Sequence, residues 1–350
     1  MQTAMPTLAL LALLVASGGY ANEFKLTRTS KGVPDLTGFY DGGTLTPLNR
    51  PQEFGDKRYL TRAEADAVAA RAAAEFAESD SDPERGPPQT GGDGRQQYGA
   101  GGVGGYNTFY VDRGTAMDEI DGKIPTSIIY DPPNGRQPPM TPAARKKAAD
   151  NASSFIYHND GTASWLAKGG HGPFDGPEDL ALAERCIMGF TSGAPSLPSL
   201  YNNYRRIIQT ESHVMILLEM VHDARVIRLN AEHGPADNRR WLGDSVGHWE
   251  GDTLVVDTVN FRSRSPLSGA DENLHVLERF TPQDNGDILY DFTVTDPTAW
   301  TAPWRGQFVW KRSAERVYEY ACHEGNYAMG NILRGARLLE KEWIEERGSE

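Results

Sequence analysis

The feature of this sequence that most restricts its fold is a series of short runs with a period of two, which begins at Tyr201. Apolar and polar residues alternate in these runs, as is typical of β-strands that bury one face. The eight runs are NYRRIIQT, HVMILLEM, ARVIRLN, DTLVVDTVNF, LHVLERFTP, DILYDFTVTDP, GQFVWKR and VYEYACH. No segment of helical length separates them. The sequence therefore predicts neighbouring strands that pair antiparallel, without parallel crossovers.

Turn residues lie between these runs, at Thr210-Glu211-Ser212, Glu250-Gly251-Asp252 and Asp284-Asn285-Gly286-Asp287. Asn-Gly between two alternating runs is a strong hairpin signal. About eight strands in such a meander would close into a barrel, which removes exposed edges and leaves a cavity for one small ligand. A sandwich of two sheets is the alternative closure. The sequence thus predicts a mainly β fold, with the barrel domain over residues 151–345.

The first 150 residues follow a different pattern. Residues 1–21 are predicted to be an export signal, because an apolar run too short to span a membrane precedes small residues at Gly19 and Ala21. Residues 22–150 are expected to be irregular and partly helical. A capping box from Thr61 to Glu64 begins one helix, which should end near Phe76. Thr141 and Pro142 begin a second helix, and residues 78–105 form a Gly-rich loop expected to be mobile.

Charge and cysteine content restrict the partners and the compartment. The net charge of −13 argues against nucleic acids and anionic membrane surfaces as partners, and no second apolar run predicts membrane insertion. The only two cysteines, Cys186 and Cys322, would form a disulfide in an exported protein or remain two buried thiols. No CxxC, HExxH or His-x-His pattern is present, so no metal and no cofactor is predicted. A metal held by His248, His323 and a carboxylate is the alternative.

Several literal stretches resemble a family of exported bacterial proteins of uncharacterised function. These stretches are ERC, YNNYRRIIQT, EMVHDARVI, GDSVGHWEGDTLVVDTVNF and YACHEGNYAMGNILRGAR, and the resemblance covers about residues 35–338. It implies an N-terminal signal, a periplasmic or secreted location and a lipocalin-like β-barrel. The triplet from Gly247 to Trp249 is similar to the tryptophan motif that closes lipocalin barrels. It would place His248 and Trp249 on opposite faces of one strand.

The stretch from Gly243 to Gly247 is a literal G-x-S-x-G motif around Ser245. A serine nucleophile in such a motif needs a sharp turn from a strand into a helix. The residues that follow predict a strand instead, so a turn held by Asp244 and Ser245 is the competing interpretation.

The stretch YEYACHEGNY, residues 318–327, contains the strongest candidates for chemistry. Gly325 would end the strand there, and a desolvated imidazole or carboxylate at a barrel mouth would suit proton transfer. The predicted catalytic residues are His323, Glu324, His248 and Tyr320. The predicted substrate-binding residues are Tyr327, His222, Trp304 and His275. A buried structural histidine at 323, and a surface turn around His222 and Asp223, are the competing interpretations.

These observations predict an exported barrel that binds a small, largely apolar molecule. We expect metal-free acid–base chemistry on that molecule, of the lyase, isomerase or hydrolase type. The alternative is a carrier that binds its ligand without chemistry. The two share the same strand pattern, so the pattern alone does not separate them.

Overall fold

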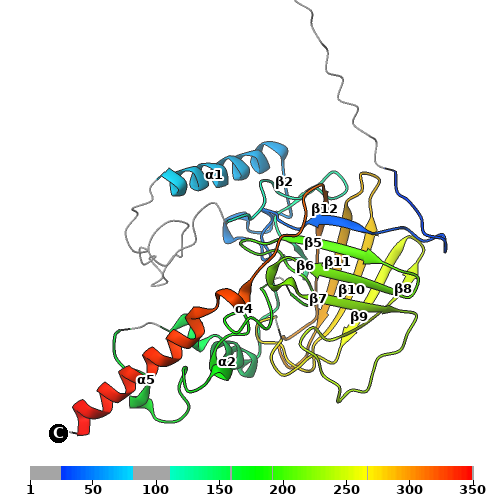
Figure 1. The fold of residues 1–350 in the computed structure, drawn as a ribbon. Helices are drawn as coiled ribbons and strands as arrows, with labels where there is room; N and C mark the ends of the chain where they lie inside the picture. Colours follow the sequence, from blue (N-terminus) through cyan, green and yellow to red (C-terminus); the bar gives the residue numbers. More distant parts are fainter. Residues whose placement is uncertain (1–24, 82–110, 158–159, 191, 266, 349–350) are drawn as a thin grey trace, which may run out of the picture.

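The computed structural model describes residues 25–81, 111–157, 160–190, 192–265 and 267–348. The predicted export signal at 1–21 and most of the Gly-rich loop at 78–105 lie outside these residues. Nine strands form a closed ring in which each strand pairs with two neighbours (Figure 1). In ring order, the strands are β1 (Gly38–Asp41), β5 (Tyr204–Gln209), β6 (His213–Leu218), β7 (Ala224–Leu229), β8 (Asp244–Glu250), β9 (Thr253–Val259), β10 (His275–Pro282), β11 (Ile288–Thr295) and β12 (Trp304–Ser313).

The predicted barrel is confirmed, but its purely antiparallel pairing is wrong. Strands β7 and β8 run parallel, with Ile227 opposite Ser245. Each antiparallel pair reverses the strand direction, so a closed ring must contain an even number of antiparallel pairs. Nine strands make nine pairs and therefore need at least one parallel pair. The connection over residues 230–243 is long enough for this crossover, although it forms no helix.

Two strands account for the difference from the expected eight. β8 begins within residues 243–247, where a turn was one interpretation of the sequence, and β1 comes from the region expected to lie outside the barrel. The expected strand VYEYACH does not form, because the chain leaves the barrel after Ser313. The three predicted hairpin turns are confirmed. In the last of them Gly286 adopts a φ of 91°, which explains the glycine.

Short strands and helices surround the ring. β4 (Ile129–Asp131) pairs with the beginning of β12, and β2 (Tyr59–Leu60) pairs with β3 (Ile124–Pro125). The helices are α1 (Arg62–Ser81), α2 (Pro142–Asn151), α3 (Ser153–Ile156), α4 (Cys322–Gly325) and α5 (Tyr327–Gly348). Single 3-10 turns lie at Gln52–Phe54, Ser164–Lys168, Pro177–Asp179 and Met220–His222. None of these helices is long and apolar enough to cross a membrane.

Two predicted helix starts are confirmed by their caps. The Thr61 backbone N–H donates to the Glu64 carboxylate at 2.8 Å, and the Ala144 N–H donates to Thr141 Oγ1 at 3.1 Å. Each cap satisfies a backbone group that the first helical turn leaves without a partner. Residues 177–186, which precede and include Cys186, form one 3-10 turn followed by turns. Both cysteines form one disulfide, with the two Cα atoms 5.7 Å apart.

Large side chains fill the interior of the barrel. Alternate residues of every strand point inward, and the aromatic ones contact one another edge to face or tilted. Tyr290 lies 4.8 Å from Trp310 and 5.3 Å from Phe308 between ring centroids. The segment at 192–196 is buried against this core, and the Ser196 N–H donates to the Tyr290 hydroxyl at 3.0 Å. The interior also holds an ion pair between Arg225 and Glu278, and Glu278 accepts from the Tyr290 hydroxyl.

Candidate functional site

A groove of about 680 Å³ lies on the outside of the barrel, between strands β1, β5 and β6 and the segment that follows β12. We call residues 314–321 the strap, because this segment crosses the outer face of the barrel on its way to α4 (Figure 1). The groove is lined by Phe39, Arg206, Leu217, His222, Arg316, Val317, Tyr318 and Glu319. Half of these residues come from the strap.

Strand alternation explains which side chains reach the groove. Arg206 lies between the buried residues Arg205 and Ile207, and Leu217 lies between Ile216 and Leu218. Because successive side chains of a strand point to opposite faces, Arg206 and Leu217 point outward. Phe39 is placed in the same way on β1. The barrel therefore supplies a rigid wall, and the strap supplies the opposite wall.

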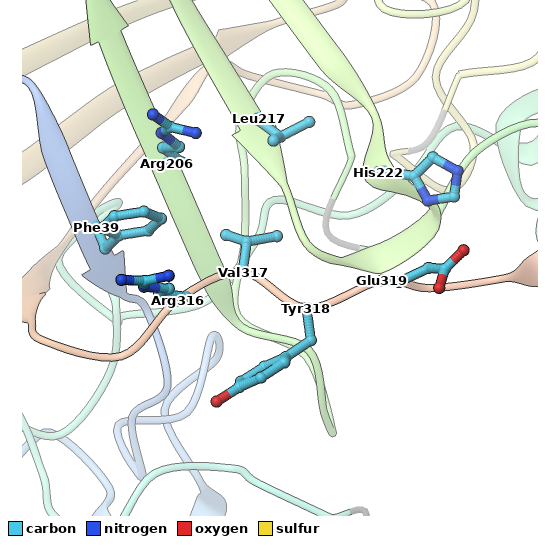
Figure 2. A pocket seen from close by; sticks show the side chains of 8 residues that line it. All are labelled: Phe39, Arg206, Leu217, His222, Arg316, Val317, Tyr318 and Glu319. Atoms are coloured by element: carbon cyan, nitrogen blue, oxygen red, sulfur yellow. The ribbon is translucent and has the colours of Figure 1, made fainter.

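The groove has two chemically different ends, as Figure 2 shows. The guanidinium groups of Arg206 and Arg316 lie at the Phe39 end, and the Arg206 guanidinium lies 5.2 Å from the centre of the Phe39 ring. His222 and Glu319 lie at the other end, with Leu217 and Val317 between the two ends. The site thus combines an apolar floor with two cations at one end and an imidazole and a carboxylate at the other.

His222 is held by an unusual backbone. Val221 and His222 have φ values of 59° and 41°, in the left-handed region that non-glycine residues rarely adopt. Asp223 fixes the turn that follows, since its backbone oxygen accepts from the Leu218 N–H at 2.9 Å. Its carboxylate accepts from the Gly189 N–H at 3.1 Å and from the Ser192 hydroxyl. Strained backbone that neighbouring contacts hold in place is a recurrent feature of functional sites.

The strap is attached at both ends. It begins at the end of β12, and Cys322 at its far end is bonded to the buried Cys186. Asn326 reinforces this attachment by donating to the Glu184 carbonyl at 2.8 Å. Between the two ends the strap pairs with none of the barrel strands. The disulfide therefore helps to hold one wall of the groove.

The barrel interior, where the sequence predicted the ligand, is occupied by side chains. Trp304, predicted to bind substrate, is fully buried there and packs edge to face on Phe292 and Trp300 at 5.7 Å. A second hollow of about 190 Å³, lined in part by Arg264 and Met188, also lies outside the ring. The structure thus offers the outer groove, rather than the interior, as a place for a ligand.

The predicted catalytic residues do not come together. His323 and Glu324 are exposed in the single turn of α4, and no contact joins either of them to His248 within the described residues. Tyr320 is half-buried on the strap, and Tyr327 is exposed at the start of α5. The expected strand would have carried these side chains to a barrel mouth. The chain turns away from the barrel before it reaches them.

Ser245 and His248, the two residues of β8 considered for catalysis, lie on opposite faces of the strand. Ser245 points into the barrel, where its hydroxyl lies 2.9 Å from that of Thr258, so the G-x-S-x-G motif forms neither an exposed elbow nor a turn. His248 points outward, contacts Glu250 at 3.2 Å and faces away from the inward Trp249, as predicted. His248 is far more exposed than a group enclosed in a pocket, with 54% of its side chain accessible.

His275 belongs to a chain of ionisable groups that sequence reasoning missed. Its Nε2 lies 2.8 Å from Asp257 Oδ2, and the other Asp257 oxygen lies 2.8 Å from His233 Nε2. His233 Nδ1 lies 3.3 Å from Asp244, which also accepts from Arg228 at 2.9 Å. We call Arg228, Asp244, His233, Asp257 and His275 the charge chain. It crosses the outer face of β7 to β10.

The hydrogen bonds of the charge chain shift its pKa values. The hydrogen bond that His275 donates to the Asp257 carboxylate raises the pKa of His275. Burial alone would raise the pKa of Asp257, but the hydrogen bonds from His275 and His233 outweigh it and lower that pKa. His275 and Asp257 thus each favour the charged form of the other. In sequence, these residues are spread over forty-odd positions, and His233 lies in the connection between β7 and β8, so no local pattern joins them.

No group of three or more His, Cys, Asp or Glu side chains in the described ranges is arranged to hold a metal ion. Comparison with family models and with curated proteins gives no match to this chain. The class that the fold defines is a closed, mixed β-barrel with a packed interior. The resemblance to exported bacterial proteins remains a prediction.

Proposed function

We propose that this protein binds a small, largely apolar molecule in the outer groove and that His222 exchanges a proton with it. The observation that carries the proposal is the position of His222. A strained connection places the imidazole at one end of a groove whose floor is Phe39, Leu217 and Val317. The groove volume lies within the roughly 300–1,000 Å³ that is usual for small-molecule sites.

The chemistry that fits this end of the groove is general acid–base catalysis. The neutral imidazole would accept a proton from a C–H or O–H group of the ligand and return it to another position. No other reactant is needed for such an isomerisation. Glu319 lies at the same end and would stabilise the imidazolium while it exists (Figure 2). The apolar floor would exclude water from the bound face of the ligand.

Binding in the groove can be tested by filling it. Leu217→Trp places an indole in the groove, whereas Met215→Trp places the same indole two residues earlier on the same outward face of β6. We expect native mass spectrometry of the Met215→Trp variant, after exposure to an extract of the source cells, to retain a bound small molecule. The Leu217→Trp variant should lose it. Equal retention by both variants would contradict the groove as the site.

Proton transfer can be tested on the captured molecule. The wild-type protein in D₂O should introduce deuterium at a carbon of the ligand, and His222→Gln should abolish this while the ligand still binds. Deuterium incorporation by His222→Gln at the wild-type rate would contradict the catalytic role. Binding without any incorporation by the wild type would identify the protein as a carrier, the function typical of lipocalin-like barrels.

The charge chain supports a second candidate for proton transfer. Asp257 orients two imidazoles, and one of them, His275, has an accessible side chain. An imidazole oriented by a carboxylate is the arrangement that general bases use. If His222→Gln retains deuterium exchange, His275→Gln should remove it, and this outcome would transfer the catalytic role to the charge chain.

We also propose that the protein is exported to the periplasm or beyond. The disulfide between Cys186 and Cys322 supports this location, because such bonds persist in oxidising compartments. A fusion of the first 30 residues to a reporter that is active only outside the cytoplasm should give activity. Deleting residues 8–16, the centre of the apolar run, should remove it.

A further inference from the structure

We infer that the ligand of the groove is an organic monoanion, such as a medium-chain carboxylate, whose charged group binds between Arg206 and Arg316. This inference rests on the proposed function and names the class of molecule that the groove would select. It follows from the charges at the two ends of the groove rather than from its volume.

Among the residues that the structure describes, these two guanidinium groups have no carboxylate partner. Neither Arg206 nor Arg316 contacts a carboxylate within the described part of the chain, although the protein carries an excess of acidic residues. Most arginines on the barrel surface do have such partners: Arg279 contacts Glu250 at 2.8 Å and Arg228 contacts Asp244 at 2.9 Å. A guanidinium recognises a carboxylate through charge-assisted hydrogen bonds, so two of them at the same end of the groove favour an anionic group.

The middle of the groove selects for an apolar body. Leu217 and Val317 lie between the charged ends, and the Phe39 ring lies beneath the Arg206 guanidinium (Figure 2). An alkyl chain that extends from the bound carboxylate would cover these side chains. Moving this apolar surface out of water would favour binding. A wholly polar anion would leave this surface exposed.

The far end selects against a second negative charge. Glu319 lies there beside His222, so a carboxylate at both ends of a ligand would meet like charge (Figure 2). Like charges that face each other in a binding site lower affinity and give specificity by repulsion. The groove should therefore prefer a monocarboxylate to a dicarboxylate of the same length.

Isothermal titration calorimetry with octanoate, octan-1-ol and octanedioate separates these contributions. The wild-type protein should bind octanoate about tenfold or more tightly than the alcohol, as charge-assisted bonds to two guanidiniums imply. Arg206→Ala and Arg316→Ala should each reduce octanoate affinity and leave the alcohol unchanged. Arg279→Ala, on the opposite outer face, is the matched control and should change neither. Glu319→Gln should raise the affinity for octanedioate.

Each outcome tests one of three statements: that the ligand is an anion, that Glu319 repels a second negative charge, and that the groove is the binding site. If octanol binds as tightly as octanoate and Leu217→Trp abolishes both, the anion is wrong and the groove stands. If octanedioate binds more tightly than octanoate, the repulsion by Glu319 is contradicted. If none of the three probes binds to the wild-type protein, the groove fails as the site, and the proposed function fails with it.

Discussion

Arg205 points into the barrel and Arg206 points out of it, because consecutive side chains of β5 lie on opposite faces. The Arg205 guanidinium stacks over Trp310 at 4.5 Å and donates to the Asn203 carbonyl at 2.9 Å. Burial lowers its pKa to about 10. The Arg206 guanidinium instead lies 5.2 Å from the centre of the outward Phe39 ring and contacts no carboxylate of the described residues. Of two adjacent arginines, one thus packs in the core and the other lines the groove, where we propose that it binds a ligand.

The candidate site could be predicted from sequence only in part. The sequence predicted His222 to bind substrate, and its side chain does line the groove. Arg206 and Arg316 carry no motif, and they lie on different elements that approach only because the strap crosses the barrel. His323 and Glu324 were favoured because a strand was expected to carry them. Side-chain chemistry was visible in the sequence, but the path of the strap was not.

The buried Asp118 should make the free energy of unfolding depend on pH. Burial raises its pKa to about 6, and the Lys311 ammonium at 3.9 Å offsets this only partly. Between about pH 4 and 6 the unfolded chain is then ionised at this residue while the folded chain keeps its proton. The free energy of unfolding should fall as the pH rises through this window, by about 2–3 kcal/mol.

Asp118→Asn should remove this dependence, because the amide stays neutral. The variant should be more stable than the wild type at pH 7.5 and close to it at pH 4.5, as measured by urea unfolding. Asp252→Asn, an exposed carboxylate paired with Arg28, is the control. A loss of stability in Asp118→Asn at pH 7.5 would show that its carboxylate is a stabilising anion.

His275 gives a prediction about titration. The hydrogen bond that His275 donates to Asp257 raises the pKa of His275, so its stabilising effect should be complete below about pH 6.5 and decline as the pH rises through the folded-state value. Asp257→Asn should lower the pKa of His275 toward its ordinary value, measured by NMR titration of the imidazole. An unchanged titration midpoint would mean that the charge chain is not coupled in solution.

At the scale of elements, most barrel strands could be predicted because period-two alternation is local. Seven of the eight expected runs coincide with β5, β6, β7 and β9 to β12. Only the end of β8, at His248 and Trp249, was predicted, because Gly243 and Gly247 suggested a turn before it, although Gly247 packs against Ile227 inside the sheet. β1 was missed because four residues are too few to show a period. The parallel pairing follows from ring closure, which no local pattern contains.

The disulfide at the end of the strap should stabilise both the fold and the groove. The bond links residues 136 positions apart, so it restricts the unfolded chain strongly, by up to about 4–5 kcal/mol on chain-entropy grounds. The double variant Cys186→Ser, Cys322→Ser should have a lower melting temperature. It should also bind octanoate more weakly, because the strap carries Arg316 and Val317.

Chemical reduction of the wild-type protein should reproduce both effects, which separates the bond from the serine side chains. A variant that melts earlier but binds octanoate with unchanged affinity would show that α5 and Asn326 hold the strap without the disulfide. The groove would then be independent of the redox state.

At the scale of the whole molecule, the barrel encloses charged side chains as well as aromatic side chains. Arg225 and Glu278 are 3% and 0% exposed and lie within hydrogen-bond distance, and Glu278 also accepts from Tyr290 at 2.7 Å. A buried pair of this kind adds little net stability, but a single member left without its partner is costly. The pair therefore ties β7 to β10 across the interior.

Arg225→Met should lower the free energy of unfolding by about 3–5 kcal/mol, because it leaves the buried Glu278 without its cation. The double variant Arg225→Met, Glu278→Leu should recover most of that loss, as measured by urea unfolding. If the double variant is less stable than Arg225→Met alone, the hydrogen bond from Tyr290 to Glu278 matters more than the ion pair.

We propose above that this barrel binds its ligand on its outer face, under the strap, and not in its interior. Hydrogen exchange of the full chain, with and without octanoate, tests it most directly. We predict slower exchange over residues 314–321 and 219–223 and unchanged exchange in β10 to β12. Protection confined to β10 to β12 and the buried segment at 192–196 would contradict the account and place the ligand inside the barrel.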